Sequence, residues 1–443
     1  MSLASRSLVL QKPNLGGLLD QPVLLPLALA LLPGGAVLAL LLLAWTAWKG
    51  RVADALLGTV LLTLANPVLF SADPTGIGRW GIVLSAFFLL STWNIRNVGV
   101  SLAIAGFGAY LLWGAAFVSS IPTLSLFKGG IFVAAIWVLF NSARINWDGF
   151  SARMDRFIPL YVLLTLPILA FPAIGLARNA LGFQGLTNQP QVLGILLAMF
   201  GVWLFARLWG EQITVRPWVA WATLLVLALL IIESQARTAL GGLAAGVALI
   251  WLFQLFARRG LGLKSVVLAA AVVLASGLIW TQTTVIQDVV YKQRFGGQRE
   301  DLTQGLDSRL NIAAISVENF QDSPIVGIGF GVPSVSEEAG LTNEPIFGLP
   351  IAANVEKGVW VTAALEELGI LGFSLLCLMF AALAAYSVVQ RKPLALALLL
   401  TLLITSLGEN TLFSIGAMGL VQWLLFFSAL HSQNQIVKPS ISS

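Results

Sequence analysis

The sequence has almost none of the side chains that proteins use for redox chemistry or for metal binding by nitrogen and sulfur. It contains one cysteine, Cys377, and one histidine, His431, among 443 residues. A single cysteine cannot form an intramolecular disulfide. A single histidine, at the end of the last apolar run, excludes a cluster of histidine metal ligands and a Ser/His/Asp triad. A metal could be held only by carboxylates, and we expect no cofactor and no metal site.

Charged residues are also scarce. They make up 10% of the chain, against about 25% in a typical soluble domain, while 58% of the residues are hydrophobic. This composition excludes a soluble globular protein. The 25 Lys and Arg residues form no dense run of the kind that binds nucleic acid. The composition predicts an all-α integral membrane protein, a bundle of about 12 transmembrane helices with one large external loop that contains short helices.

The apolar runs set the boundaries of the predicted spans. In the first run, Pro33-Gly34-Gly35 indicates either one kinked span or a pair of short re-entrant pieces. The polar first twenty residues lack a cleavable signal sequence, so the first span is expected to direct insertion. The predicted spans are 23–48, 52–70, 79–93, 99–119, 126–141, 157–177, 190–208, 217–233, 237–257, 265–281, 358–389, 393–408 and 411–430.

The distribution of positive charge predicts the orientation, because cytoplasmic loops carry an excess of Lys and Arg. One side is poor in them, and its short turns hold Arg79, Lys128, Arg178 and Arg237. The other side is rich and is predicted to be cytoplasmic. It holds Lys49, Arg51, Arg96, Arg144, Arg153, Arg156, Arg207, Arg216, Arg258, Arg259, Lys264, Arg391, Lys392 and Lys438.

This orientation predicts a multi-pass protein of the cytoplasmic membrane whose one long polar segment lies on the periplasmic or extracytoplasmic side. We divide the single integral domain into a bundle at 1–281, this external loop at 282–357 and C-terminal spans at 358–443. In the loop, Asp307 or Ser308 is suited to cap a helix that ends before Pro324. The glycine turn Gly327–Gly331 that follows is expected to return the chain to the membrane.

Ionisable residues at the rims of spans are costly and are therefore functional candidates. Glu233 and Arg237 are four residues apart and either pair with each other or serve separately, and Glu409 is a further candidate. Small residues that follow Arg237 allow neighbouring helices to approach closely, which favours a crevice around its side chain. Arg309 starts the predicted loop helix, where the dipole disfavours a cation, so it either binds an anion or is solvated.

A second group of charges lies around the start of the span at 358–389. Glu366 and Glu367 lie nine and ten residues beyond Lys357, about 13–15 Å along a straight helix. They lie either within the membrane or in a surface segment that precedes it. Glu356 and Lys357 face the same outer space as Arg237.

Three sequence motifs in this order resemble the O-antigen ligase and O-antigen polymerase superfamily. A Ser/Gln-x-Arg-Thr-Ala stretch opens a small-residue span at Ser234–Leu240. A large external loop then has an arginine-led helix, at Arg309, that runs into Ser-Pro-Ile-x-Gly-x-Gly at Ser323–Gly329. The next span opens with Glu-x-Gly-x-x-Gly at Glu367–Gly372. A fainter similarity covers Thr187–Gly194, and the resembling region spans roughly residues 185–385.

The resemblance implies a metal-independent glycosyltransferase of the outer face of the cytoplasmic membrane. Its partners are an undecaprenyl-diphosphate-linked oligosaccharide donor, a glycan or lipid-linked glycan acceptor, and membrane lipids. The product is then a lipopolysaccharide or an exopolysaccharide. Arg237 and Arg309 are expected to bind the diphosphate and to stabilise its charge as the sugar–phosphate bond breaks. Lys357 and Glu367 are further predicted substrate-binding residues.

The sequence departs from the ligases of this superfamily at the position of a histidine thought to act as base. The corresponding stretch is Ala353–Gly358, which contains no histidine. Glu356 is the substitute we predict as catalytic base, since a desolvated carboxylate has a raised pKa. The departure favours a polymerase over a lipid A core ligase.

Two other functions remain open at this point. A transporter of a small anion or solute is the main alternative, although the two halves of the chain lack corresponding broken helices. A non-catalytic protein that binds lipid-linked glycans is the other, and it would use Arg237 and Arg309 without needing Glu356.

Overall fold

The computed structural model describes residues 22–70, 77–91, 94–176, 182–210, 212–257, 292–293, 299–300, 313–334 and 357–432. The regular elements of these parts are helices, apart from the short antiparallel pair of strands β1 (Lys292–Gln293) and β2 (Arg299–Glu300). An additional helix covers residues 313–322. The remaining elements are α2 (Leu24–Ala30), α3 (Gly35–Trp48), α4 (Val52–Thr63), α5 (Ile77–Leu90), α6 (Val98–Phe117), α7 (Pro122–Asn141), α8 (Trp147–Thr165), η1 (Leu166–Ala170), α9 (Pro172–Gly175), α10 (Pro190–Trp209), α11 (Pro217–Glu233), α12 (Arg237–Ala257), α16 (Trp360–Val389), α17 (Pro393–Thr405) and α18 (Met418–His431).

The described helices support an integral membrane protein. Four of them, α6, α7, α10 and α16, are long and apolar enough to cross a bilayer, and several shorter apolar helices accompany them. Large apolar side chains such as Trp48, Phe88 and Phe117 are exposed on the outside of the bundle, which suits contact with lipid. The predicted number of about 12 spans stays a prediction, and the predicted span 265–281 lies outside the described residues.

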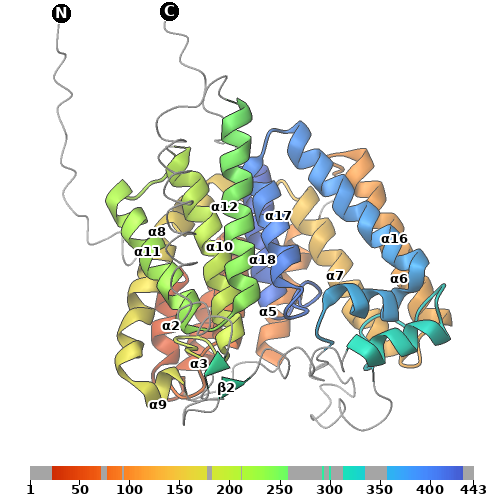
Figure 1. Ribbon diagram of the computed structural model, residues 1–443, viewed down its shortest axis with the longest axis horizontal. Coiled ribbons are helices and arrows are strands. Elements are labelled where there is room, and N and C mark those ends of the chain that lie inside the picture. Colours follow the sequence, from red (N-terminus) through yellow and green to blue (C-terminus); the bar gives the residue numbers. More distant parts are fainter. Residues whose placement is uncertain are drawn as a thin grey trace, which may run out of the picture.

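The core of the bundle lies around α10 and α18, which Figure 1 shows at the centre between α8 and α16. Nearly every residue of both helices is buried, as expected for helices that are apolar on all sides. Aromatic rings fill the space around α18, where Trp423 contacts Phe132 and Phe380 at centroid distances of 6.2 Å each. This packing fixes the positions of α7 and α16 relative to α18.

Small residues bring α12 and α17 into close contact. The hydroxyl of Thr401 donates to the carbonyl of Gly242 at 3.1 Å, and a Cβ at Gly246 would lie 2.5 Å from the Thr401 Oγ1. Backbones approach this closely only where the residues are small. The small-residue stretch after Arg237 therefore does what the sequence predicted, since it lets another helix pack against the start of α12.

The structure corrects several predicted spans. The run 23–48 is two helices, because Gly34 has a φ of 72° between α2 and α3. The predicted span 157–177 begins earlier, at Trp147, and its end is broken into η1 and α9, where Pro167 and Pro172 remove helical donors. The predicted span 411–430 is helical only from Met418, so residues 406–417 form a non-helical connection.

Two buried ion pairs tie α8 to its neighbours at the arginine-rich end. Arg207 donates to Asp155 at 2.6 Å, and Arg153 donates to Asp54 at 2.8 Å. Arg207 and Arg153 were counted in cytoplasmic connections, whereas the structure places Arg207 inside α10 with only 7% of its surface exposed. Each pair is bidentate, which suits the planar fork of an arginine.

Candidate functional site

The first turns of α16 and the segment before it form a buried charge cluster, which we call the Lys357 cluster. The ammonium of Lys357 lies 3.2 Å from Glu366 Oε2 and 3.0 Å from Glu367 Oε1. Lys357 is 1% exposed, Glu366 0% and Glu367 5%. Such burial is tolerated only when the charges are paired, and Lys357 is held by its charge, because its ammonium makes no hydrogen bond with the described residues. Glu366 and Glu367 are therefore buried inside the protein, and the two depths in the membrane that the sequence leaves open stay predictions.

The carboxylates of this cluster hold the segment that returns from the external loop. Glu366 accepts hydrogen bonds from Asn319 Nδ2 at 2.6 Å and from the Ser334 hydroxyl at 2.9 Å. Glu367 accepts the N–H of Gly331 at 2.8 Å. Because Asn319 and Ser334 flank the glycine turn, two adjacent acidic residues fix both sides of it.

Lys128 of α7 adds a second cation to the cluster. Its ammonium donates to the carbonyl of Gly331 at 3.1 Å, and it interacts electrostatically with Glu367 and Lys357. The two lysines and two glutamates balance in charge, which lowers the cost of burying them together. The sequence analysis assigned no role to Lys128. Its presence on the side predicted to be poor in Lys and Arg was the one feature that could have indicated a role.

A break in α16 lets the glycine turn join the helix through the backbone. Gly369 has a φ of 60°, and the N–H groups of Ile370 and Leu371 donate to the carbonyls of Pro324 and Ile325 at 2.9 and 3.2 Å. In return, the carbonyl of Glu367 accepts the N–H of Gly329 at 3.1 Å. The groups that the break frees are thus satisfied by the turn.

Tyr110 of α6 closes the other side of this junction. Its hydroxyl contacts the carbonyls of Leu368 at 2.5 Å and Val326 at 3.1 Å. A Cβ at Gly327 would collide with the backbone of Glu367, so this position requires glycine. Figure 1 shows the two arms of α16 meeting at an angle beside α6, next to the helix of residues 313–322 drawn in teal. The glycine turn is therefore docked on α16 through backbone hydrogen bonds, and its predicted return to the membrane stays a prediction.

Arg237 begins α12 at the same end of the bundle. Its side chain is partly buried, and it follows Gln235, whose φ of 54° turns the chain sharply out of α11. The preceding turn packs on the start of α10, where a Cβ at Gly194 would lie 3.0 Å from Ser234 Oγ. The side chain of Glu233 is exposed at the end of α11, and its carbonyl accepts the N–H of Phe183 at 2.9 Å.

The α17–α18 connection brings the starts of α12 and α16 together. The N–H of Trp360 donates to the carbonyl of Ser406 at 3.2 Å. Two residues later, a Cβ at Gly408 would lie 3.0 Å from the Cβ of Thr238, in the first turn of α12. The starts of α12 and α16, which follow Arg237 and Lys357 closely, therefore flank one short stretch of chain, and the side of the membrane that they face stays a prediction. Arg309 and Glu356 lie outside the described residues, although Glu356 directly precedes Lys357.

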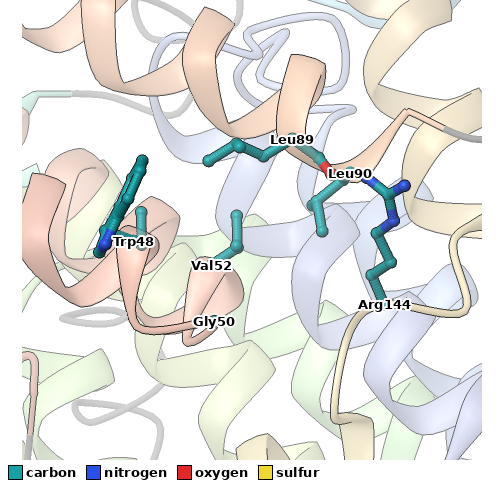
Figure 2. Close-up of a pocket in the computed structure, with 7 residues that line it drawn as sticks. Trp48, Gly50, Val52, Leu89, Leu90 and Arg144 are labelled. Carbon is teal, nitrogen blue, oxygen red and sulfur yellow. Dashed lines mark hydrogen bonds between the residues drawn. The ribbon is translucent and has the colours of Figure 1, made fainter.

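A pocket of about 260 Å³ lies at the arginine-rich end of the bundle, away from these residues. Figure 2 shows Trp48 and Arg144 on opposite sides of it, with Leu89 and Leu90 above Val52. The Arg144 guanidinium donates to the carbonyl of Leu89 at 2.5 Å. We assign it no part in the site, because the predicted site residues that the structure describes, Arg237, Lys357 and Glu367, lie at the other end. Among the described residues, no group of three or more His, Cys, Asp or Glu side chains is arranged to hold a metal ion.

Comparison with known proteins gives one family. Residues 222–350 match the family model described as O-antigen ligase. No curated protein matches the chain. The matched segment starts in α11, includes Arg237, Arg309 and the glycine turn, and ends before Lys357. It supports a membrane enzyme of the ligase or polymerase type and does not favour a transporter. This match over residues 222–350 confirms the resemblance of the chain to the O-antigen ligase superfamily.

Proposed function

We propose that the protein transfers a glycan from an undecaprenyl-diphosphate-linked donor to a glycan or lipid-linked glycan at the outer face of the cytoplasmic membrane. The observation on which this proposal rests is that the α17–α18 connection contacts the starts of both α12 and α16. Contacts of Ser406 and Gly408 bring the beginning of α16 and the beginning of α12 to the same place. Arg237 and Lys357 lie near these two helix starts, which supports a shared site for Arg237 and the predicted base Glu356.

The proposed step is substitution at the anomeric carbon of the donor sugar. The acceptor hydroxyl oxygen forms a bond to that carbon, while the bond from the carbon to the diphosphate oxygen breaks. The diphosphate leaves with the bonding electrons, and the hydroxyl proton passes to Glu356 as base. Arg237 and Arg309 bind the diphosphate, whose negative charge grows as the bond breaks, so their attraction is greatest in the transition state.

The Lys357 cluster supports a positioning role for two of the predicted substrate-binding residues. Lys357 and Glu367 are almost fully buried and contact each other, and Glu367 also contacts the glycine turn. This arrangement fixes Lys357 against α16, and we propose that it thereby positions the base Glu356, which directly precedes Lys357 in the sequence. Direct contact of Lys357 or Glu367 with substrate stays a prediction. The lack of histidine favours polymerisation of O-antigen or exopolysaccharide units over transfer to lipid A core.

The test is release of undecaprenyl diphosphate from a lipid-linked oligosaccharide by purified protein in liposomes, beside the variant Arg309→Ala. We expect release by the parent protein and a loss of at least about a hundredfold in the variant. The size of the glycan product separates polymerisation from a single transfer. No release from several donors, with solute flux across the same liposomes, would overturn the proposal in favour of a transporter.

A further inference from the structure

The α17–α18 connection, residues 406–417, joins two helices that are each too short to cross a bilayer. α17 has 13 residues and α18 has 14, which corresponds to about 20 Å of helix against a hydrocarbon core of about 30 Å. At the arginine-rich end the two helices are level, since Lys392 donates to the carbonyl of Ser432. The length that the two helices lack therefore lies at their opposite, outer end, where the connection joins them.

Aromatic contacts give the depth of the connection. The ring of Phe413 packs on Phe132 of α7, with centroids 5.3 Å apart. Phe132 stands ten residues beyond Pro122, the first residue of α7, which is about 15 Å along the helix. Phe413 also contacts Phe330 of the glycine turn at 5.2 Å. Both non-helical segments thus reach well below the outer end of α7.

Non-helical backbone at this depth is stable only when it is buried in protein or faces water. One face of the connection is buried, since Leu412 is 0% exposed and Trp423 Nε1 donates to its carbonyl at 3.1 Å. Glu409 and Asn410 are partly exposed on the same connection. Glu409 follows Gly408, which packs on the first turn of α12, so these two residues lie nearer the outer rim than Phe413 does. A carboxylate there is costly in lipid, and we expect the exposed part of both residues to face water on the outer side.

The polar atoms indicate what binds there. Asn410 Oδ1 is buried and accepts no hydrogen bond from the described residues. An amide oxygen needs a donor, which a diphosphate at neutral pH does not offer and a sugar hydroxyl does. The carboxylate of Glu409 likewise repels phosphate and accepts from hydroxyls. Both residues follow Gly408, which packs against Thr238 next to Arg237. A sugar attached to a diphosphate on Arg237 would reach them.

We propose that Glu409 and Asn410 form a glycan-binding subsite in which their side-chain oxygens accept hydrogen bonds from sugar hydroxyls. The subsite is open to water on the outer side of the membrane. It deepens the proposed function and rests on it for the identity of the sugar, which belongs to the lipid-linked donor. Its water access is a property of the fold and stands apart from the reaction.

Water access is tested by cysteine labelling in the full-length protein. Asn410→Cys and Glu409→Cys are made separately in a Cys377→Ser background and treated in proteoliposomes with a charged, membrane-impermeant thiol reagent. We expect both to react. The parent protein is the matched control, because its Cys377 lies at an exposed position of the apolar helix α16, where we expect lipid to keep the thiol from a charged reagent. Failure of both variants to react, while they remain monodisperse and folded, would overturn the proposal.

Sugar recognition is tested by protection of the same cysteines. We expect an undecaprenyl-diphosphate-linked oligosaccharide, at about ten times its dissociation constant, to slow labelling of Asn410→Cys about tenfold. Undecaprenyl diphosphate without sugar should leave the rate unchanged. Equal protection by both lipids would overturn the sugar assignment. If the parent protein releases undecaprenyl diphosphate from the same donor and no protection occurs, the subsite is wrong and the proposed function stands.

Discussion

The ammonium of Lys357 lies 3.0 Å from one oxygen of Glu367, and the other oxygen of that carboxylate accepts the N–H of Gly331 at 2.8 Å. One side chain of α16 therefore connects the residue before the helix to the turn that ends the external loop. The glycine turn, which belongs to the segment similar to O-antigen ligases, and the helix α16 that follows this segment meet at this carboxylate. Its loss should affect the position of both segments at once.

Lys357→Met should destabilise the protein strongly. It would leave two adjacent buried carboxylates without their nearest cation, and removing one partner of a buried ion pair costs about 3–5 kcal/mol. The measurement is the thermal unfolding midpoint in detergent, followed by tryptophan fluorescence. Lys49→Met is the matched control, because Lys49 is exposed at the end of α3 and its loss should change stability by about 0.5 kcal/mol or less.

A triple variant separates charge from packing in the same cluster. Lys357→Met combined with Glu366→Gln and Glu367→Gln removes the uncompensated charges and keeps the side-chain volumes. We expect it to recover part of the lost stability. An unfolding midpoint for Lys357→Met equal to that of the parent would show that the cluster contributes nothing to stability.

Gly369→Ala should disrupt the junction between α16 and the glycine turn. A Cβ at this position would collide with the carbonyl of Ile325, and the φ of 60° disfavours any other residue. We expect a loss of monodisperse protein on size-exclusion chromatography and faster proteolysis after residue 312. Gly106→Ala in α6 is the control, since a Cβ there has no neighbour within 4 Å. If both variants behave alike, the junction does not depend on Gly369.

Hydropathy predicted the helices whose whole length is apolar and failed where a break depends on tertiary contacts. The bounds of α10, α11 and α12 lie within a residue of the predicted spans. The break at Gly369 was not predictable, because Gly369-Ile370-Leu371-Gly372 reads as ordinary apolar helix. The left-handed conformation is stabilised by Pro324 and Ile325, more than forty residues earlier in the chain.

The sequence predicted which residues belong to the site better than it predicted the contacts between them. Charge at a span rim selected Arg237, Glu366 and Glu367, because burying a charge in lipid is costly. Nothing in the spacing indicated that Lys357 would reach both glutamates, since the link at Gly358 and Val359 is not helical. The partners Asn319 and Ser334 are ordinary polar residues of a loop, and only the docked turn gives them a role.

Arg237→Ala should lower transfer about 10²–10³-fold, the effect of removing one donor that stabilises a developing oxyanion. Arg237→Lys should recover only part of the rate, because an ammonium lacks the planar fork that binds two phosphate oxygens. The measurement is the initial rate of undecaprenyl diphosphate release in liposomes. Arg216→Ala is the matched control, since Arg216 is exposed at the opposite end of α11. Equal loss in both variants would argue for a general effect of arginine removal.

Glu356→Gln should lower the rate of transfer while leaving donor binding intact. The amide cannot accept the proton of the acceptor hydroxyl, so the chemical step slows. The diphosphate is bound by Arg237 and Arg309, so the donor should bind equally well. Two measurements are needed, single-turnover release of undecaprenyl diphosphate and equilibrium binding of the lipid-linked oligosaccharide to protein in nanodiscs. Glu318→Gln, at an exposed position of the helix 313–322, controls for removal of an outer carboxylate. A variant that loses donor binding together with the rate would show that Glu356 has a structural role in the loop. The base would then have to be sought among the other outer carboxylates. Glu409 would be the first to test, because it follows Gly408, which packs against the first turn of α12.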